Sequence, residues 1–164
     1  MITFKRLTLD DTAILQSVLE RALKYSFYAD GLDYVPKESA KTVLIEIPPG
    51  ISYEDKYVFL VLNDDSPVGA IDVINGYPDP ETAFIGLLLI AEDMHGLGLG
   101  RLSYEKLELF IRDELELNNI MLAYLESNPV EGFWSKLGYS KIEEKRPYNG
   151  LNRKTFSQRM IKII

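Results

Sequence analysis

Three glycines at alternate positions, 96, 98 and 100, stand between a long apolar run and a helical pattern, and this junction constrains the fold most strongly. The run at residues 82–90 is apolar at almost every position, which is typical of a central strand covered on both faces. After the glycines, apolar residues recur at helical spacing and predict a long amphipathic helix that ends near residues 118–119. The chain therefore enters a helix from a buried strand through a glycine-rich turn.

The glycine-rich turn has two interpretations. Glycine leaves backbone N–H groups unshielded, and together with the positive end of the helix dipole such a turn can bind a pyrophosphate. Alternatively, the turn needs glycine only because its backbone adopts positive φ. The segment is not a P-loop, because Gly-x-x-x-x-Gly-Lys-Ser/Thr is absent, and its Gly-x-Gly-x-Gly spacing is a poor match to the Rossmann fingerprint.

The rest of the chain alternates strands with helices and includes one early hairpin. The expected strands lie at 2–7, 57–62, 68–74, 120–125, from 139 onward, and near 156–163. The expected helices are one that follows the capping pattern at 8–11 and continues to near Ala29, and shorter ones at 36–47 and 130–137. This order, over 164 residues, predicts a single α/β domain, 1–164, with a mixed sheet whose faces are at least partly covered by helices.

Composition excludes several classes of chemistry. The chain has no cysteine, so a thiolate nucleophile and a disulfide scaffold are both excluded. The single histidine, His95, excludes a multi-histidine zinc site, and we expect no metal. With 25 acidic and 18 basic residues the net charge is −7, which argues against nucleic acid as a partner. No apolar run is long enough to span a bilayer and no signal-like N-terminus is present, so we expect a cytoplasmic protein that does not bind membranes.

Three ordered segments resemble one known family. His95, Gly98 and Gly100 match the acetyl-CoA signature Gln/Arg-x-x-Gly-x-Gly/Ala of the GNAT superfamily of N-acetyltransferases, and only the first position differs. The preceding residues 85–94 are similar to that family's fourth strand. Asn128 and the segment Phe-Trp-Ser-Lys-Leu-Gly-Tyr at 133–139 are similar to the family's Asn…Phe-Tyr-x-Lys-Leu-Gly-Phe. The resemblance covers residues from about 56 to 146, whereas the N-terminal helices match only in type.

The resemblance implies a fold, an activity and a cofactor site. The implied fold is a mixed, mostly antiparallel sheet flanked by helices, whose fourth and fifth strands splay apart around the pantetheine arm of acetyl-CoA. The implied activity moves the acetyl group from acetyl-CoA directly to a primary amine. The residues that the resemblance assigns to the cofactor are Leu88, Leu89, Ile90, His95, Gly96, Leu97, Gly98, Leu99, Gly100, Arg101, Asn128, Phe133 and Trp134.

Four of these side chains also have a purely structural interpretation. His95 either donates to a phosphate oxygen or caps the loop, and Arg101 either adds charge at a phosphate or is simply solvated. In the family the asparagine that corresponds to Asn128 contacts the cofactor arm, but an asparagine here could also cap the helix that begins near residue 130. Trp134 packs either on the cofactor arm or in the core.

The reaction needs a base, because an alkylammonium group with a pKa of about 10.4 must lose a proton before it can attack. Candidate bases are Glu81 at the start of the fourth strand, Glu126 at the end of the fifth and, as a weaker choice, Asp72. Without cysteine, a cysteinyl acyl-enzyme cannot form. The sequence therefore favours direct attack of the bound amine on the thioester.

The general acid departs from the family pattern. The family commonly protonates the leaving thiolate with a tyrosine, and Trp134 stands at that position in this chain. An indole N–H cannot serve as that acid. Either Tyr139 or Tyr124 replaces it, or the thiolate leaves unassisted, since a thiol pKa of about 8.5 makes it a fairly good leaving group.

Aromatic and acidic residues cluster where the family's first helices border the acceptor site; they are Tyr25, Phe27, Tyr28, Asp30, Asp33 and Tyr34. Aromatic rings and carboxylates suit an ammonium-bearing substrate, although the same residues also fit helix packing beside a polar turn. We therefore expect a small cationic amine as the acceptor, with a peptide or protein amine as the alternative.

Two non-enzymatic functions stay open on the sequence alone. The missing tyrosine favours a non-catalytic, acetyl-CoA-binding regulatory module. The third hypothesis is an interaction domain whose glycine turn binds nothing. Strand edges could pair two copies into a homodimer, but nothing in the sequence selects one.

Overall fold

A computed structural model describes all 164 residues, and its central feature is an eight-stranded sheet in the order β1-β2-β3-β4-β5-β8-β6, with β7 also paired to β8. All pairs are antiparallel except β4 with β5, which is parallel. The strands are β1 (Ile2–Arg6), β2 (Lys56–Asn63), β3 (Ser66–Asn75), β4 (Thr82–Ile90), β5 (Asn119–Leu125), β6 (Ser140–Lys141), β7 (Arg146–Asn149) and β8 (Lys154–Ile163).

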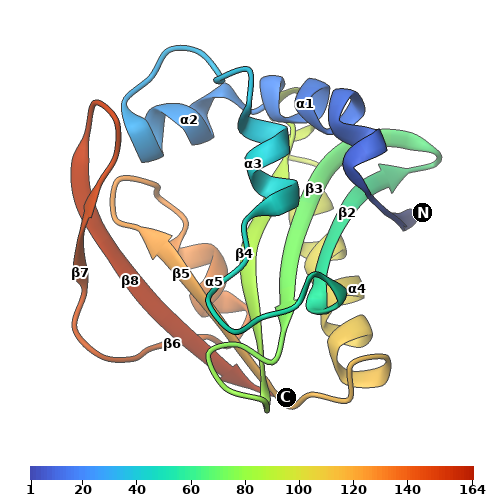
Figure 1. The fold of residues 1–164 in the computed structure, drawn as a ribbon, viewed down its shortest axis with the longest axis vertical. Coiled ribbons are helices and arrows are strands. Elements are labelled where there is room, and N and C mark those ends of the chain that lie inside the picture. The colour runs from blue at the N-terminus through green and yellow to red at the C-terminus, as the bar shows by residue number, and fades with distance from the viewer.

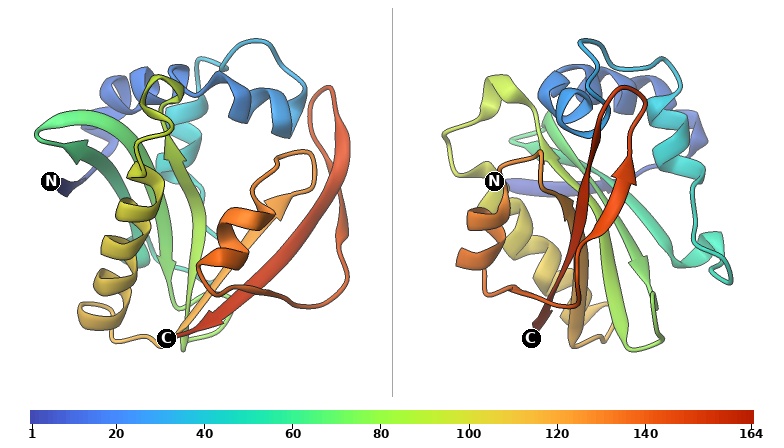
Figure 2. Two further views of the ribbon diagram at one scale, coloured as in Figure 1. Left: turned by 180° about the vertical axis from the view of Figure 1, so that it is seen from behind. Right: turned by 90° about the vertical axis from the view of Figure 1, so that its left-hand side faces the viewer.

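Helices cover both faces of this sheet (Figures 1 and 2). On one side lie α1 (Thr12–Glu20) and α3 (Ser39–Ile45), with α2 (Leu23–Asp30) beside them near the sheet's end. On the other side lie α4 (Leu99–Asp113) and α5 (Glu131–Lys136). One buried apolar cluster fills each side, so the predicted mixed, mostly antiparallel sheet flanked by helices is confirmed. No helix combines the length and apolar character that crossing a membrane requires.

The strands β4 and β5 separate part of the way along their length. They pair from Thr82 opposite Asn119 to Ile85 opposite Leu122; beyond that point β4 stays paired only with β3, and β5 only with β8. Gly86 is an extra residue in β4, because Asp72 of β3 pairs with Leu87 while the next residue pairs with Ile85. This β-bulge bends β4 where β5 diverges from it. The predicted splaying of the fourth and fifth strands is confirmed.

The first long helix is not continuous, contrary to the sequence-based expectation. It is interrupted between α1 and α2, where Ala22 adopts a non-helical conformation. The carbonyl of Arg21 there accepts a hydrogen bond from the amide of Glu92, at 2.8 Å, instead of continuing the helix. A residue 71 positions away therefore ends α1, and local periodicity carries no signal of it.

The end of α4 and the presence of β7 also differ from the sequence-based expectation. Helix α4 ends at Asp113, earlier than predicted, because Glu116 has left-handed backbone geometry and the Leu117 amide returns to the Ile111 carbonyl at 3.1 Å. The strand β7 is exposed at every position and carries no apolar alternation, so the sequence did not predict it. The capping box of Thr8 and Asp11 is present as expected, although it caps a short 3-10 turn at Leu9–Asp11.

Candidate active site

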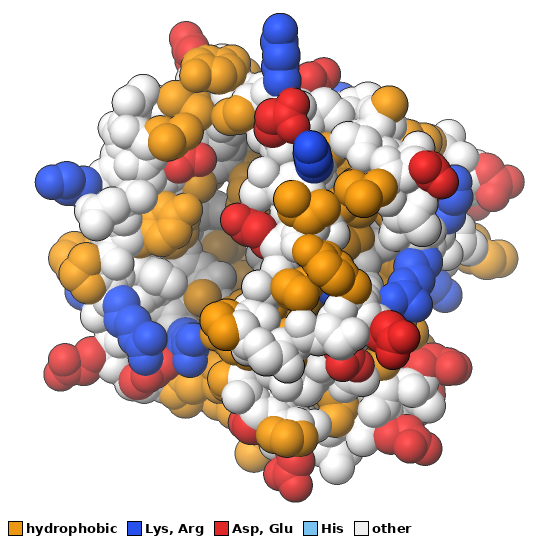
Figure 3. All heavy atoms as spheres, viewed as in Figure 1, with side chains coloured by type: hydrophobic (Ala, Val, Ile, Leu, Met, Phe, Trp, Pro, Cys, Tyr) orange, Lys and Arg blue, Asp and Glu red, His pale blue; other side chains and the backbone are white.

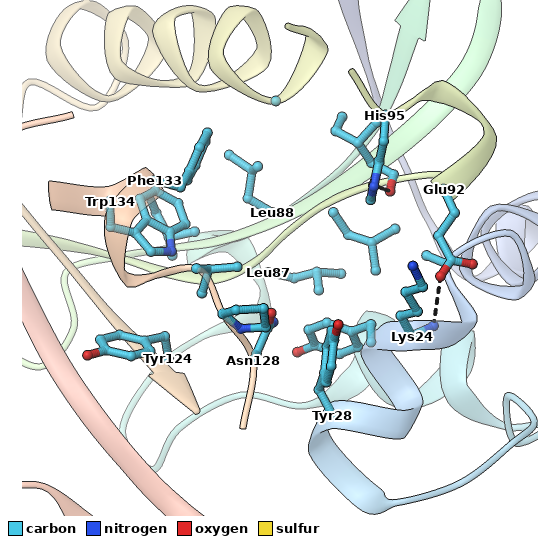
Figure 4. A pocket seen from close by; sticks show the side chains of 18 of the residues that line it. Lys24, Tyr28, Leu87, Leu88, Glu92, His95, Tyr124, Asn128, Phe133 and Trp134 are labelled. Atoms are coloured by element: carbon cyan, nitrogen blue, oxygen red, sulfur yellow. Dashed lines mark hydrogen bonds between the residues drawn. The ribbon is translucent and has the colours of Figure 1, made fainter. Parts of the chain in front are cut away.

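A cleft of about 670 Å³ opens between the separated ends of β4 and β5 (Figure 4). The N-terminus of α4 forms one end, and residues of α2 lie at the other. Of the residues that the sequence assigned to the cofactor, all except Leu97 line this cleft. Leu97 is 62% exposed and does not line the cleft, so the predicted contact of its side chain with the cofactor is not supported.

The glycine turn leaves backbone donors free at the start of α4. Gly96 and Gly98 have φ of 82° and 74°, a region that favours glycine, and Gly98 is the N-cap of the helix. A Cβ on either residue would meet nothing within 4 Å, so both border open space. The first hydrogen bond runs from the Leu102 amide to the Gly98 carbonyl at 3.1 Å, which leaves the earlier amides of the helix without partners. This arrangement fits a diphosphate, and it also satisfies the positive-φ interpretation.

The segment before the glycines is fixed to the α1–α2 break. The Arg21 guanidinium donates to both carboxylate oxygens of Asp93, at 3.1 and 2.9 Å, and to the Pro67 carbonyl at 2.7 Å. The hydrogen bonds from Arg21 lower the pKa of Asp93. The Lys24 amide donates to the Glu92 carboxylate at 3.2 Å, drawn as the dashed line in Figure 4. These contacts hold the glycine turn at a fixed place beside α2.

His95 and Arg101 line the cleft but already have protein partners. His95 Nε2 lies 2.8 Å from the Ile90 carbonyl oxygen, so the ring closes the loop that connects β4 to α4. The Arg101 side chain is 74% exposed and donates to Glu105 at 2.9 Å. Both contacts agree with the structural interpretations of these residues. Neither contact involves the free amides, so these amides remain available to an anion.

On the β5 side, Asn128 and Phe133 line the cleft, whereas Trp134 also belongs to the core. The N-cap of α5 is Val130 and receives no side-chain capping bond, so the expected alternative that Asn128 caps this helix is wrong. Trp134 is 7% exposed and packs edge-on against Tyr104 and Tyr139, with ring centroids 5.9 and 5.4 Å apart. The core interpretation of Trp134 therefore accounts for most of its surface.

None of the three predicted catalytic residues lines this cleft. Glu81 lies in an exposed turn before β4, at the end where β4 and β5 are still paired, which contradicts the expectation that it reaches the splayed region. The carboxylate of Glu126 accepts hydrogen bonds from Lys145 Nζ at 2.7 and 3.2 Å. Tyr139 is buried among aromatic rings, with its hydroxyl 3.1 Å from that of Tyr104. Strand register and long-range packing decide which way these three side chains face, and the local sequence does not predict it.

Titratable residues other than these three line the cleft. Tyr124, the second candidate acid, lines the cleft, and burial raises the pKa of its hydroxyl. Lys24 and Glu92 also line the cleft, and no pattern in the sequence indicated either. Asp72 lies on the α3 side of the sheet beside Gly86 and forms an ion pair with Lys56 at 3.0 Å. In the sequence, Asp72 stands out as the one acidic residue within the apolar strand at 68–74.

A family model describes most of the chain. Residues 15–139 match the model of the acetyltransferase (GNAT) family. Within the matched residues lie the splayed strands and the glycine turn at the start of α4. The protein therefore belongs to the GNAT acetyltransferase family, whose members are acyltransferases that use acetyl-CoA.

Solved structures share this fold at low sequence identity. An acetyltransferase from Thermus thermophilus superposes with a TM-score of 0.78 and 23% identity, covering 100% of this chain and 97% of the other. A spermidine N-acetyltransferase from Vibrio cholerae, in complex with CoA and spermine, gives 0.74 and 17%, covering 99% and 95%. A ribosomal-protein-alanine N-acetyltransferase from Brucella melitensis gives 0.72 and 15%, covering 99% of each chain. No curated protein sequence matches the chain. The named acceptors differ, so the fold does not select one.

Proposed function

We propose that this protein transfers the acetyl group of acetyl-CoA to a primary amine of a small cationic molecule. The observation that carries the proposal is one continuous cleft with free backbone amides at one end and aromatic residues of α2 at the other. Bound acetyl-CoA would supply an acetyl group activated as a thioester. The amides at residues 96–101 would hold its diphosphate, and backbone groups of β4 near Leu88, Leu89 and Ile90 would hold its arm.

The acceptor end of the cleft favours a small molecule. Tyr25 and Tyr28 of α2 line it, and their ring faces suit an ammonium group. The tip of the β7–β8 hairpin is bound to α2, because the amides of Leu151 and Asn152 donate to the Asp30 carboxylate and carbonyl at 3.1 and 2.8 Å. This clasp closes the side between the hairpin and α2, where an extended protein segment would otherwise enter. Figure 3 shows the resulting hollow, with hydrophobic side chains inside and acidic ones at its edge.

The activity can be tested by thiol release from acetyl-CoA against a panel of polyamines, monoamines, amino acids and short peptides. We expect turnover with polyamines or diamines, because Glu92 lines the cleft and the net charge is −7. Calorimetry with CoA supplies the second measurement. CoA binding without turnover on any amine would instead support the regulatory module, which the absence of predicted catalytic residues from the cleft favours. A failure to bind CoA would overturn both functions.

Tyr124→Phe is expected to lower the rate of thiol release about tenfold or more while leaving CoA affinity unchanged. Tyr124 lines the cleft, and burial and the neighbouring Glu131 raise the pKa of its hydroxyl, so the hydroxyl stays protonated and we propose that it donates to the leaving sulfur. Tyr139→Phe is the matched control, because it removes a hydroxyl that is bonded to Tyr104 outside the cleft. If Tyr139→Phe slows the reaction more than Tyr124→Phe does, the assignment of Tyr124 is wrong.

A further inference from the structure

A second, smaller cavity adjoins the cofactor cleft through the bulge in β4. Its volume is about 220 Å³, and it lies between the sheet and the layer formed by α1, α2 and α3. Tyr25, Gly86, Leu87 and Leu89 line both this cavity and the cleft. The two spaces therefore meet at Gly86, where β4 leaves β5.

Asp72 faces this meeting point from the neighbouring strand. It pairs with Leu87 across the β3–β4 ladder, and a Cβ built on Gly86 would lie only 2.8 Å from Asp72 Oδ2. Glycine at 86 therefore leaves this oxygen uncovered. The other oxygen, Oδ1, accepts a hydrogen bond from Lys56 Nζ at 3.0 Å. One carboxylate oxygen is thus anchored while the second faces the gap in the sheet.

The surroundings of Asp72 suit a group that exchanges a proton. Burial raises its pKa, and Lys56 opposes that shift without cancelling it. The Lys56 side chain is 3% exposed and that of Asp72 is 16% exposed, so the pair is largely shielded from water. The other titratable groups that face this region are Glu46 at the end of α3, Tyr25 and Asp30 of α2, and Tyr148 of β7. Burial, and then its neighbours Tyr148, Asp30 and Asp72, raise the pKa of Tyr25, so its hydroxyl stays neutral.

We propose that Asp72 Oδ2 removes the proton from the acceptor's ammonium group at the Gly86 bulge, with Lys56 holding the carboxylate in position. This inference rests on the proposed function. The ammonium nitrogen gives one proton to Asp72 and becomes a neutral amine. The amine nitrogen then forms a bond to the acetyl carbon while the carbon–sulfur bond breaks and the electron pair leaves on sulfur. The nitrogen releases its second proton to solvent, the thiolate receives one from the general acid, which solvent reprotonates, and Asp72 returns its proton to solvent. Asp72 is thereby the catalytic residue, and Lys56 is a positioning residue.

The test compares Asp72→Asn with the wild-type protein, using the best acceptor of the amine panel. We expect kcat to fall about 100-fold or more, which is the usual contribution of a general base. Calorimetry of the same amine with the protein alone, without acetyl-CoA, should show affinity weakened about tenfold, because the charge partner of the ammonium group is lost. Asp65→Asn is the matched control, since Asp65 is an exposed turn residue whose φ of 68° asparagine tolerates.

The pH profile separates a catalytic role from a structural one. Asp72 accepts a proton only when ionised, so kcat/KM should rise with pH through the pKa of Asp72. Lys56→Met removes the charge that lowers this pKa, so the acid limb of the profile should move to higher pH. In Asp72→Asn the limb should disappear. A merely structural ion pair would leave the position of the limb unchanged.

The outcomes distinguish this inference from the proposed function. Because Asp72→Asn leaves a buried lysine unpaired and can unfold the protein, Lys56→Met/Asp72→Asn is made alongside it. In either variant, CoA affinity equal to that of the wild type establishes that the fold is intact. If the wild-type protein acetylates an amine and a folded Asp72 variant keeps the same kcat and amine affinity, the proposed role of Asp72 is wrong. The proposed function would then still stand. No turnover by the wild-type protein on any amine would overturn the proposed function and this inference together.

Discussion

Replacing Gly96 and Gly98 together by alanine is expected to weaken CoA binding about 100-fold. Each alanine places a methyl group in the open space beside the free amides, and the positive φ at both positions disfavours any Cβ, by about 1–2 kcal/mol per residue. A hydrogen bond to a charged group contributes about 1.5–3 kcal/mol, so losing one or two amide contacts to the diphosphate accounts for this factor. Calorimetric titration with CoA measures the change directly.

The control for this double variant is Gly50→Ala. Gly50 has a φ of 83°, close to that of Gly96, and a Cβ there also meets nothing within 4 Å. Gly50→Ala therefore introduces the same backbone strain as alanine at position 96 or 98, but in an exposed loop away from the cleft. We expect Gly50→Ala to lower stability slightly and to leave CoA affinity unchanged. Equal CoA affinity in the double variant and in Gly50→Ala would show that the glycine turn does not bind the diphosphate of CoA.

Trp134→Ala is expected to lower the free energy of unfolding by about 3–5 kcal/mol. The indole is buried, and its ring lies within 6 Å of the centroids of Tyr104, Phe133 and Tyr139. Removing it leaves a cavity in the cluster that joins α4, α5 and the sheet. Denaturation by urea, followed by fluorescence of the tyrosines and by circular dichroism, measures the loss.

Phe133→Ala provides the comparison for this core residue. Phe133 is only partly buried, and it lines the cleft beside Gly100, whose Cβ would lie 3.6 Å from its ring. We expect it to cost less stability than Trp134→Ala and to weaken CoA binding more. The opposite order, with CoA affinity depending mainly on Trp134, would make the indole a cofactor contact rather than a core side chain.

The cofactor side of the site could be predicted from sequence because it is local. The strand, the turn and the start of α4 form one continuous segment. Gly96 and Gly98 occupy positions of positive φ, which favour glycine whatever the rest of the fold is. The α/β class and most element positions followed from periodicity in the same way. The interruption at Arg21 did not, because a hydrogen bond from the distant Glu92 ends α1.

The sequence named Asp72 only as a weaker choice of base, because the choice among the candidate carboxylates depends on register between strands. The extra residue Gly86 changes which side chains of β4 face α3, and only the β3–β4 pairing places Asp72 beside the bulge. Glu81 and Glu126 have suitable chemistry and lie at strand ends, yet the fold directs one to the paired end and the other to Lys145. Spacing along the chain reports chemistry, whereas facing direction is a property of the assembled sheet.

The clasp at Asp30 has a consequence for how specificity can change in this architecture. In the proposed site the chamber for the amine is bordered by α2, and the tip of the β7–β8 hairpin is bonded to α2 through main-chain groups of Leu151 and Asn152. A change in the length of that tip would alter the support of α2, and with it the proposed chamber, without altering an atom of the β4–α4 segment. If the proposed function holds, the part of the molecule that selects the amine is separate from the part that binds acetyl-CoA, and one can be redesigned while the other is kept.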